Sequence, residues 1–147
     1  GALAGYPMDS MKITLLDGSF HPVDSDQLSF EIAARNGYRN AAPKAGSVIL
    51  EPVMSVEVVT PEESMGDIIG DLNKRRGRVL GMNPSADGLQ EIEADVPMSE
   101  MSDFATAIRS MTQGRGYFTF DFARYEQLPS NLEAKVIEEA KKFASEE

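Results

Sequence analysis

One histidine stands out among the residues that could do chemistry, because the chain contains no other. His21 follows the turn residues Asp17-Gly18-Ser19 and Phe20. Glycine tolerates positive φ and aspartate can hydrogen-bond its own backbone, so this segment predicts a loop. A lone loop histidine is most often an ordinary surface residue, and a ligand-contacting imidazole is the alternative. The chain has no cysteine, so we expect no disulfide, no thiol nucleophile and no cysteine-based metal site, and a single histidine also excludes a histidine-rich metal site.

A run of cations in an otherwise acidic chain is the second candidate. The run comprises Lys74, Arg75, Arg76 and Arg78, and Arg109 and Arg115 lie at or after the end of a second predicted helix. Cations at a helix end favour the negative pole of its dipole, which explains them without any ligand. Positive side chains also bind nucleic-acid phosphates. We expect both helix ends to lie near one edge of the domain and to form such a phosphate-binding surface.

Motifs for enzymatic chemistry are absent. The chain has no G-x-x-x-x-G-K-[ST] phosphate loop, no G-x-G-x-x-G fingerprint and no G-x-S-x-G nucleophile elbow. Gly77–Gly81 is similar to the phosphate-binding loop of acylphosphatases. However, it follows a helix where that loop opens one, and Met82-Asn83-Pro84 stand in place of the aromatic residue and arginine of that family. We therefore expect no catalytic residue and no cofactor in this chain.

The composition is that of a globular protein. The 147 residues are 41% apolar and have a formal net charge of −10, which argues against general nucleic-acid binding outside a local basic patch. No apolar run approaches the roughly 18 residues that cross a bilayer. The N-terminus lacks the basic and apolar regions of a signal peptide. We expect a cytoplasmic location and no membrane association.

A predicted strand, turn and helix must position His21. Lys12–Leu16 alternates polar and apolar residues over a few positions, which predicts a short strand. Asp24 and Gln27 have the spacing of a capping box, and apolar residues at helical spacing follow them. We predict a helix over residues 25–42 that ends or bends at Pro43.

The cations belong to an internal repeat. The β-branched region 48–60 predicts a strand, and Thr60-Pro61-Glu62-Glu63 predicts a helix start with Thr60 as its cap. Pro97 follows Pro61 by 36 positions and begins a second copy of the same apolar pattern. The two strand–helix–strand copies span 54–82 and 89–122. This arrangement predicts an α+β, ferredoxin-like βαββαβ domain.

The repeat also predicts how the sheet is covered. Both helices should pack on one face of a four-stranded antiparallel sheet, and Phe118, Phe120 and Phe122 should face them. A further capping box at Ser130–Glu133 predicts a C-terminal helix of about fifteen residues. A stand-alone ferredoxin-like regulatory module, which would be a dimer with a ligand pocket, also fits this pattern.

Short segments along almost the whole chain resemble one family. They are Leu3–Pro7, Asp17–His21, Val23–Ser25, Leu50–Pro52, Val56–Val58, Thr60–Glu63, Gly66–Asp67, Ile69–Leu72, Arg75–Gly77, Val96–Pro97, Ser99–Met101, Ala105–Thr106, Ile108–Ser110 and Thr112–Gly116. Together, in their order and spacing, they resemble the C-terminal part of bacterial elongation factor G, the GTPase that drives translocation on the ribosome.

The resemblance implies three parts. Residues 1–49 would be a partial fourth domain with a ribosomal-protein-S5-like βαβ fold, and residues 50–128 would be the ferredoxin-like fifth domain. Residues 129–147 would be a terminal helix that packs back on the fourth domain. The GTP-binding domain is not in this sequence. We therefore expect no GTP hydrolysis by this chain, and we expect GTP and magnesium to bind elsewhere in a longer parent protein.

The resemblance also implies site residues and partners. The loop formed by Asp17, Gly18, Ser19, Phe20 and His21 would be the tip near messenger and transfer RNA at the decoding site. The cations that would face or support contacts with large-subunit ribosomal RNA and stalk-base proteins are Lys74, Arg75, Arg76, Arg109 and Arg115. The expected role is ribosome binding during GTP-dependent translocation, as a monomer. A recycling or specialised paralogue is the alternative.

Overall fold

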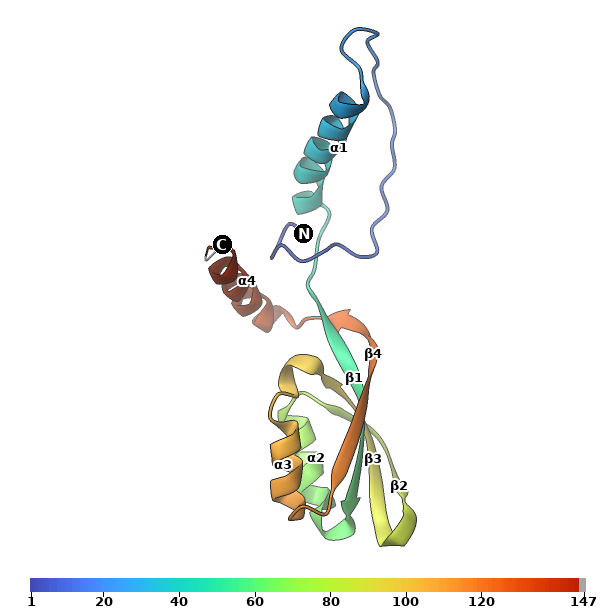
Figure 1. The fold of residues 1–147 in the computed structure, drawn as a ribbon, viewed down its shortest axis with the longest axis vertical. Coiled ribbons are helices and arrows are strands. Elements are labelled where there is room, and N and C mark those ends of the chain that lie inside the picture. Colours follow the sequence, from blue (N-terminus) through green and yellow to red (C-terminus); the bar gives the residue numbers. More distant parts are fainter. Residues whose placement is uncertain (146–147) are drawn as a thin grey trace. The chain divides into compact units, whose positions relative to one another are not determined.

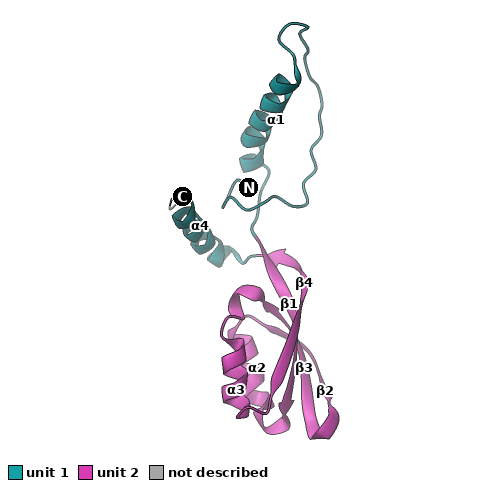
Figure 2. Ribbon diagram, viewed as in Figure 1, with its two compact units in different colours: residues 1–49, 128–147 teal, residues 50–127 magenta. Residues whose placement is uncertain are grey.

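A computed structural model describes residues 1–145 of the chain. These residues divide into two compact units, which Figure 2 shows in different colours. Unit 2 consists of residues 50–127, and unit 1 combines residues 1–49 with the described residues from 128 onward.

Unit 2 is built on a four-stranded antiparallel sheet. Its strands are β1 (Leu50–Pro61), β2 (Arg78–Pro84), β3 (Leu89–Pro97) and β4 (Tyr117–Gln127). Their order is β2-β3-β1-β4, so β1 lies between β3 and β4. The order along the chain, strand–helix–strand twice over, confirms the predicted βαββαβ fold.

Helices α2 (Met65–Lys74) and α3 (Phe104–Thr112) cover the same face of this sheet, as predicted (Figure 1). Their buried side chains include Ile68 and Leu72 from α2 and Phe104 and Ile108 from α3. These pack on the inward-facing residues of the two central strands, which include Val56, Val58, Ile92, Ala94 and Val96. Unit 2 therefore has its own hydrophobic core.

The start of α2 differs from the prediction. Strand β1 runs on to Pro61, a short 3₁₀ turn covers Glu62–Ser64, and α2 begins at Met65. The Thr60 side chain is buried and donates to the carbonyl of Pro61 at 3.2 Å, so it does not cap the helix. The capping prediction was wrong because pairing with β3, which extends to the Pro61–Leu89 pair, keeps this segment in the sheet.

The three phenylalanines of β4 are not equally packed. Phe118 joins the core and meets Phe104 edge-on, with ring centroids 4.8 Å apart. Phe120 and Phe122 remain about half exposed. The prediction that all three face the helices is confirmed, because they pair with the inward-facing Met54, Val56 and Val58 of β1, but only Phe118 is packed into the core. Strand β4 is an edge strand, and its residues beyond Phe118 run past the part of the sheet that α3 covers.

Unit 1 contains helix α1 (Gln27–Ala41), a 3₁₀ turn (Ala42–Lys44) and helix α4 (Ser130–Ala144). The predicted helices at 25–42 and near residue 130 are therefore present. No described residue of α1 or α4 is buried. The Ser130 capping box is not formed, because Ser130 already lies inside α4 and Pro129 is the N-cap residue.

The predicted strand at Lys12–Leu16 is absent from the described residues. This segment is extended, and the side chains of Ile13, Leu15 and Leu16 are largely exposed. A strand exists only where a neighbouring chain satisfies its backbone N–H and C=O groups. The alternating pattern here has no paired strand beside it, so the local preference is not realised as a sheet.

Candidate nucleic-acid interface

The tip-loop residues Asp17–His21 lie together at the surface of unit 1. All five are exposed and belong to no helix or strand. The Asp17 carboxylate accepts a hydrogen bond from the Gly18 N–H at 2.7 Å. The Phe20 ring stacks nearly parallel to Phe30 of α1, with centroids 6.5 Å apart. The loop thus presents polar and aromatic groups to solvent, which is the mixture that single-stranded RNA bases and sugars contact.

His21 is held by its own loop. Its backbone N–H donates to the Ser25 hydroxyl at 2.7 Å, and its carbonyl accepts from the Ser25 N–H at 2.9 Å. Ring atom Nδ1 lies 3.3 Å from the Val23 N–H and 3.3 Å from a carboxylate oxygen of Asp24. The side chain remains about two-thirds exposed. His21 can therefore present Nε2, which has no hydrogen-bond partner among the described residues, to a partner molecule.

Asp26 begins the helix that supports this loop. Its carboxylate accepts from the Ser29 N–H at 2.7 Å, which makes Asp26 the N-cap of α1. The capping prediction for Asp24 was therefore wrong by two residues, although the Asp24 carbonyl accepts from the Ser29 hydroxyl. Hydrogen bonds from the Ser29 side chain and then from its backbone N–H lower the pKa of Asp26.

Removing this cap should loosen the first turn of α1. We expect Asp26→Ala to speed amide hydrogen exchange at Ser29 several-fold, and Asp24→Ala to leave it unchanged, because only Asp26 accepts the Ser29 N–H. A lowered carboxyl pKa stabilises the helix above the ordinary value of 3.8, and the effect is lost as pH falls through the folded pKa. Equal effects of the two substitutions would contradict the assignment of the cap.

Arg75 lies at the end of α2 and is almost fully buried. Its Nε donates to Asp71 at 2.7 Å, and its Nη1 donates to the Glu100 carbonyl at 2.7 Å and to Asp103 at 2.5 Å. The guanidinium also lies 5.1 Å from the centre of the Phe104 ring. Arg75 therefore ties α2 to the segment that starts α3.

These contacts decide the charge state of the cluster. Burial by itself would lower the pKa of Arg75, but the hydrogen bonds and charges of Asp103 and Asp71 outweigh it and raise the pKa. In return, the Arg75 hydrogen bond and charge lower the pKa of Asp103. Both partners stay ionised near neutral pH, so the positive charge of Arg75 is compensated within unit 2.

Arg76 is also paired with acids. Its Nη1 and Nη2 donate to the two carboxylate oxygens of Glu51 at 2.8 and 2.9 Å, and its Nε donates to Glu100 at 3.2 Å. The Glu51 hydrogen bonds are the main cause of its raised pKa.

The N–H of Gly77 reaches the Leu72 carbonyl at 2.8 Å, and a Cβ on Gly77 would lie 2.6 Å from that oxygen. Glycine at this position lets the chain turn sharply after α2.

The two groups of cations do not meet at one edge. Arg76 pairs with Glu51 at the start of β1, whereas Arg115 pairs with Glu63 just after its end. Strand β1 has 12 residues, or about 35–40 Å at roughly 3.3 Å per residue. The expectation of a single basic edge was wrong because α2 and α3 run in opposite directions, which puts their C-terminal ends at opposite ends of the sheet (Figure 1).

Two of the predicted cations keep their charge available. Lys74 and Arg109 are exposed and belong to none of the ion pairs among the described residues. Most of the acidic partners of the other cations could not be predicted from the sequence. The spacing of Asp71 and Arg75, four positions apart on one helix, was a local signal for one pair. Contact with ribosomal RNA remains a prediction for all five cations.

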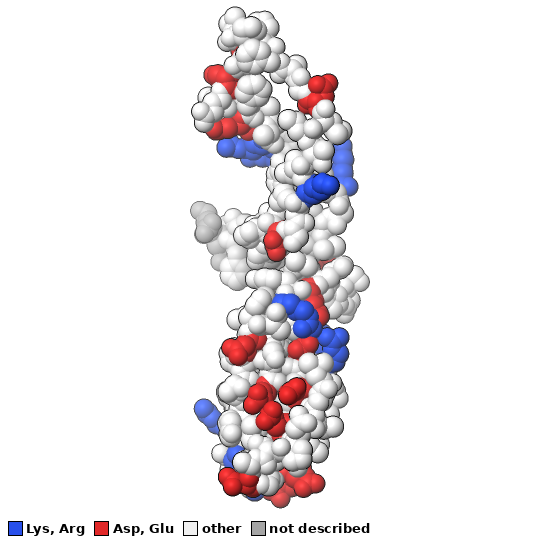
Figure 3. All heavy atoms as spheres, turned by 90° about the vertical axis from the view of Figure 1, so that its right-hand side faces the viewer, with Lys and Arg blue, Asp and Glu red and all other residues white. Residues whose placement is uncertain are grey.

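The sheet face opposite the helices is acidic. Val56 and Val58 point into the core, so Glu57 between them points to the other face, where it is paired with Glu93. Asp121 of β4 points to the same side. Figure 3 shows acidic side chains over the middle of this face. Like charges on neighbouring strands repel, and they would also repel phosphates.

One end of this face holds a mixed cluster. Arg124 donates to Asp95 at 2.7 Å and also pairs with Glu126, and Arg78 approaches Asp95 at 3.4 Å. The hydrogen bond to Asp95 is the main cause of the raised pKa of Arg124. The cluster therefore binds strands β2, β3 and β4 together and uses its cations internally.

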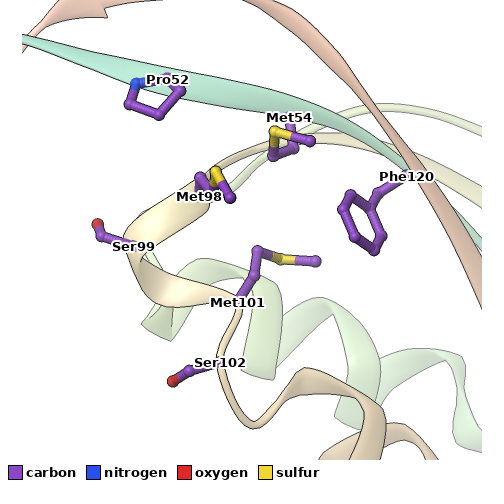
Figure 4. A pocket seen from close by; sticks show the side chains of 7 residues that line it. All are labelled: Pro52, Met54, Met98, Ser99, Met101, Ser102 and Phe120. Carbon is purple, nitrogen blue, oxygen red and sulfur yellow. The ribbon is translucent and has the colours of Figure 1, made fainter.

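Unit 2 also has an apolar pocket of about 570 Å³. Its lining includes Met54, Met98, Met101 and Phe120, with Ser99 and Ser102 at the side (Figure 4). No charged side chain lines it. Among residues 1–145 no group of three or more acidic or histidine side chains is placed to hold a metal ion, and no helix is long and apolar enough to cross a membrane.

These features define a class of protein: a ferredoxin-like α+β domain with its own core, joined to a unit with an exposed loop and helix. Two family descriptions match the chain in this order, "Elongation factor G, domain IV" over residues 1–46 and "Elongation factor G C-terminus" over residues 48–136. The chain belongs to the elongation factor G family.

Two relatives show how much of the family the chain represents. An "Elongation factor G-like protein" of Thermotoga maritima is 48% identical over all 147 residues, which are 22% of that protein. A crystal structure of a Thermus thermophilus protein matches 86% of the chain and 19% of its own length, with a TM-score of 0.76 and 36% identity. The chain thus spans about a fifth of the length of the proteins it matches.

Proposed function

We propose that this chain is the ribosome-contacting C-terminal part of a factor that promotes GTP-dependent translocation of tRNA and mRNA. The observation that supports this most strongly is that both family descriptions occur in the family's order along residues 1–136. GTP and magnesium would bind in another domain of the parent protein. In this proposal the chain itself does no chemistry and acts by contact, as a monomer in the cytoplasm.

The two units would have separate roles. The exposed loop Asp17–His21 would enter the decoding site, where the imidazole of His21 and the Phe20 ring would meet RNA and hinder the moved tRNA from slipping back. Unit 2 has a packed core and internally paired cations, which suits an anchor near the large-subunit GTPase centre and the stalk-base proteins. Lys74 and Arg109 would be its free phosphate contacts. The anchor would couple the nucleotide state to the position of the tip.

A specialised or recycling paralogue is the second candidate. The name of the Thermotoga relative, "Elongation factor G-like protein", supports this candidate, because it sets that protein apart from elongation factor G itself. A toeprinting assay of the full-length parent on pre-translocation ribosomes with GTP separates the two. We expect the messenger to move by one codon. Ribosome binding without movement would instead identify a recycling or specialised factor, and failure to bind ribosomes would contradict both.

A further inference from the structure

Charge is segregated along the N-terminal part of unit 1. Residues 13–31 hold four acids, Asp17, Asp24, Asp26 and Glu31, and no lysine or arginine. Residues 32–50 hold Arg35, Arg39 and Lys44 and no acid. Figure 3 shows a group of acidic side chains near the top of this unit and basic side chains next to them. The net charge of the whole chain hides this polarity.

Helix α1 repeats an Arg-Asn pair one turn apart. Arg35-Asn36 and Arg39-Asn40 are separated by four positions, so the two arginines lie in one row about 6 Å apart along the helix axis, and the two asparagines lie in the next row. All four residues are exposed. We call them the α1 stripe. It presents only side chains that can donate several hydrogen bonds.

Among the described residues, the side chains of the α1 stripe form no ion pair and no hydrogen bond. Every ion pair of the described residues involves other side chains, whereas the arginines at the ends of the unit 2 helices and strands are mostly matched with acids. Two arginines four positions apart on a helix repel each other slightly. An anionic ligand would relieve that repulsion.

We propose that the α1 stripe binds the phosphate backbone of RNA. Arginine and asparagine are residues that contact phosphate and sugar in nucleic-acid complexes, and such contacts position a protein without reading sequence. This inference rests on the proposed function and adds a second RNA contact to it. The acidic tip would touch bases and sugars by shape and hydrogen bonding, whereas the α1 stripe, on the same helix that the tip leads into, supplies the attraction.

The salt dependence of RNA binding tests this proposal. The full chain, with a fluorescein-labelled RNA hairpin, is measured by fluorescence anisotropy between about 50 and 200 mM KCl. In the variant with Arg35→Gln and Arg39→Gln, the slope of log affinity against log salt should fall by about 1 for each phosphate that is no longer neutralised. Circular dichroism checks that α1 remains helical, because glutamine is a good helix former.

A charge-matched control is available on α4. The variant with Lys135→Gln and Lys142→Gln removes the same charge from cations paired with Glu139 and Glu138, and its slope should match that of the unchanged chain. A slope unaltered in the α1 variant, or altered equally in both variants, would overturn the proposal.

Sedimentation of the same proteins with ribosomes separates this inference from the proposed function. Hairpin binding through the α1 stripe without ribosome binding would support the stripe and contradict the translation role. If the α1 variant binds ribosomes and the salt slope of its RNA binding is unchanged, the translation role is supported and the α1 stripe is contradicted as an RNA contact. Loss of ribosome binding with an unchanged RNA slope would show that the α1 stripe meets an acidic protein surface, which also overturns the RNA assignment.

Discussion

Replacing Arg75 by methionine is expected to lower the free energy of unfolding of unit 2 by about 2–3 kcal/mol. The change removes hydrogen bonds to Asp71, the Glu100 carbonyl and Asp103 but keeps most of the apolar volume. The cost stays below that of a fully buried pair because the Asp103 side chain is 74% exposed and water can solvate it. Urea unfolding followed by circular dichroism, with amide exchange in α2 and α3, measures the effect.

Arg115→Met is the matched control for this prediction. Arg115 pairs with Glu63, and both side chains are more than half exposed, so its loss should cost about 0–1 kcal/mol. Similar losses for the two variants would contradict the view that Arg75 links α2 to the start of α3, while Arg115 forms a surface pair.

Acid should reduce the difference between the unchanged chain and Arg75→Met. The Arg75 hydrogen bond and charge lower the pKa of Asp103 below its ordinary value of 3.8. A lowered carboxyl pKa contributes stability that is complete above the unfolded value and is lost as pH falls through the folded one. The gap between the two proteins should therefore be constant near neutral pH and shrink below pH 3.8. A constant gap down to strong acid would show that Asp103 is not the relevant partner.

Replacing His21 by alanine in the full-length parent is expected to slow translocation about tenfold, with GTP hydrolysis nearly unchanged. The estimate is the loss of one hydrogen bond to a charged RNA group, about 1.5–3 kcal/mol, part of which water replaces. In the described residues Nε2 of His21 has no hydrogen-bond partner, whereas Nδ1 lies beside the Val23 N–H and the Asp24 carboxylate. Single-round translocation and GTP hydrolysis should be measured on the same ribosomes.

His21→Gln tests the role assigned to the ring. Glutamine keeps an N–H donor at a similar reach, so it should restore part of the translocation rate. A role in proton transfer would not be restored by glutamine. Equal loss of translocation and GTP hydrolysis in His21→Ala would contradict the assignment of His21 to the tip contact and point to a general defect in ribosome binding.

Local patterns were sufficient for the fold of unit 2. The repeat offset between Pro61 and Pro97 and the apolar faces around Ile68 and Phe104 predict two strand–helix–strand copies, and the structure has them. Helix α1 was found the same way, although its cap is Asp26 and not Asp24. These predictions use only the spacing of residues a few positions apart, which can be read from a single sequence.

Long-range pairing decided the rest. The segment Lys12–Leu16 has the alternation of a strand, but a strand also needs a neighbouring chain, and none pairs with it in the described residues. Phe120 and Phe122 alternate like Phe118, yet their burial depends on how far α3 extends over β4. Neither condition can be read from the local pattern.

The charged residues of the candidate site show most clearly the difference between what local sequence patterns predict and what depends on the folded structure. The order of residues along the chain already shows that arginines gather near residues 75–78. The tertiary structure decided which of them remain available. It brings Asp103, Glu100 and Glu51, which are 24 to 28 positions away, against Arg75 and Arg76, and it places Arg115 at the opposite end of the sheet. Coulomb attraction acts through distance in space, so the residues left free to bind a phosphate become visible only when the chain is folded.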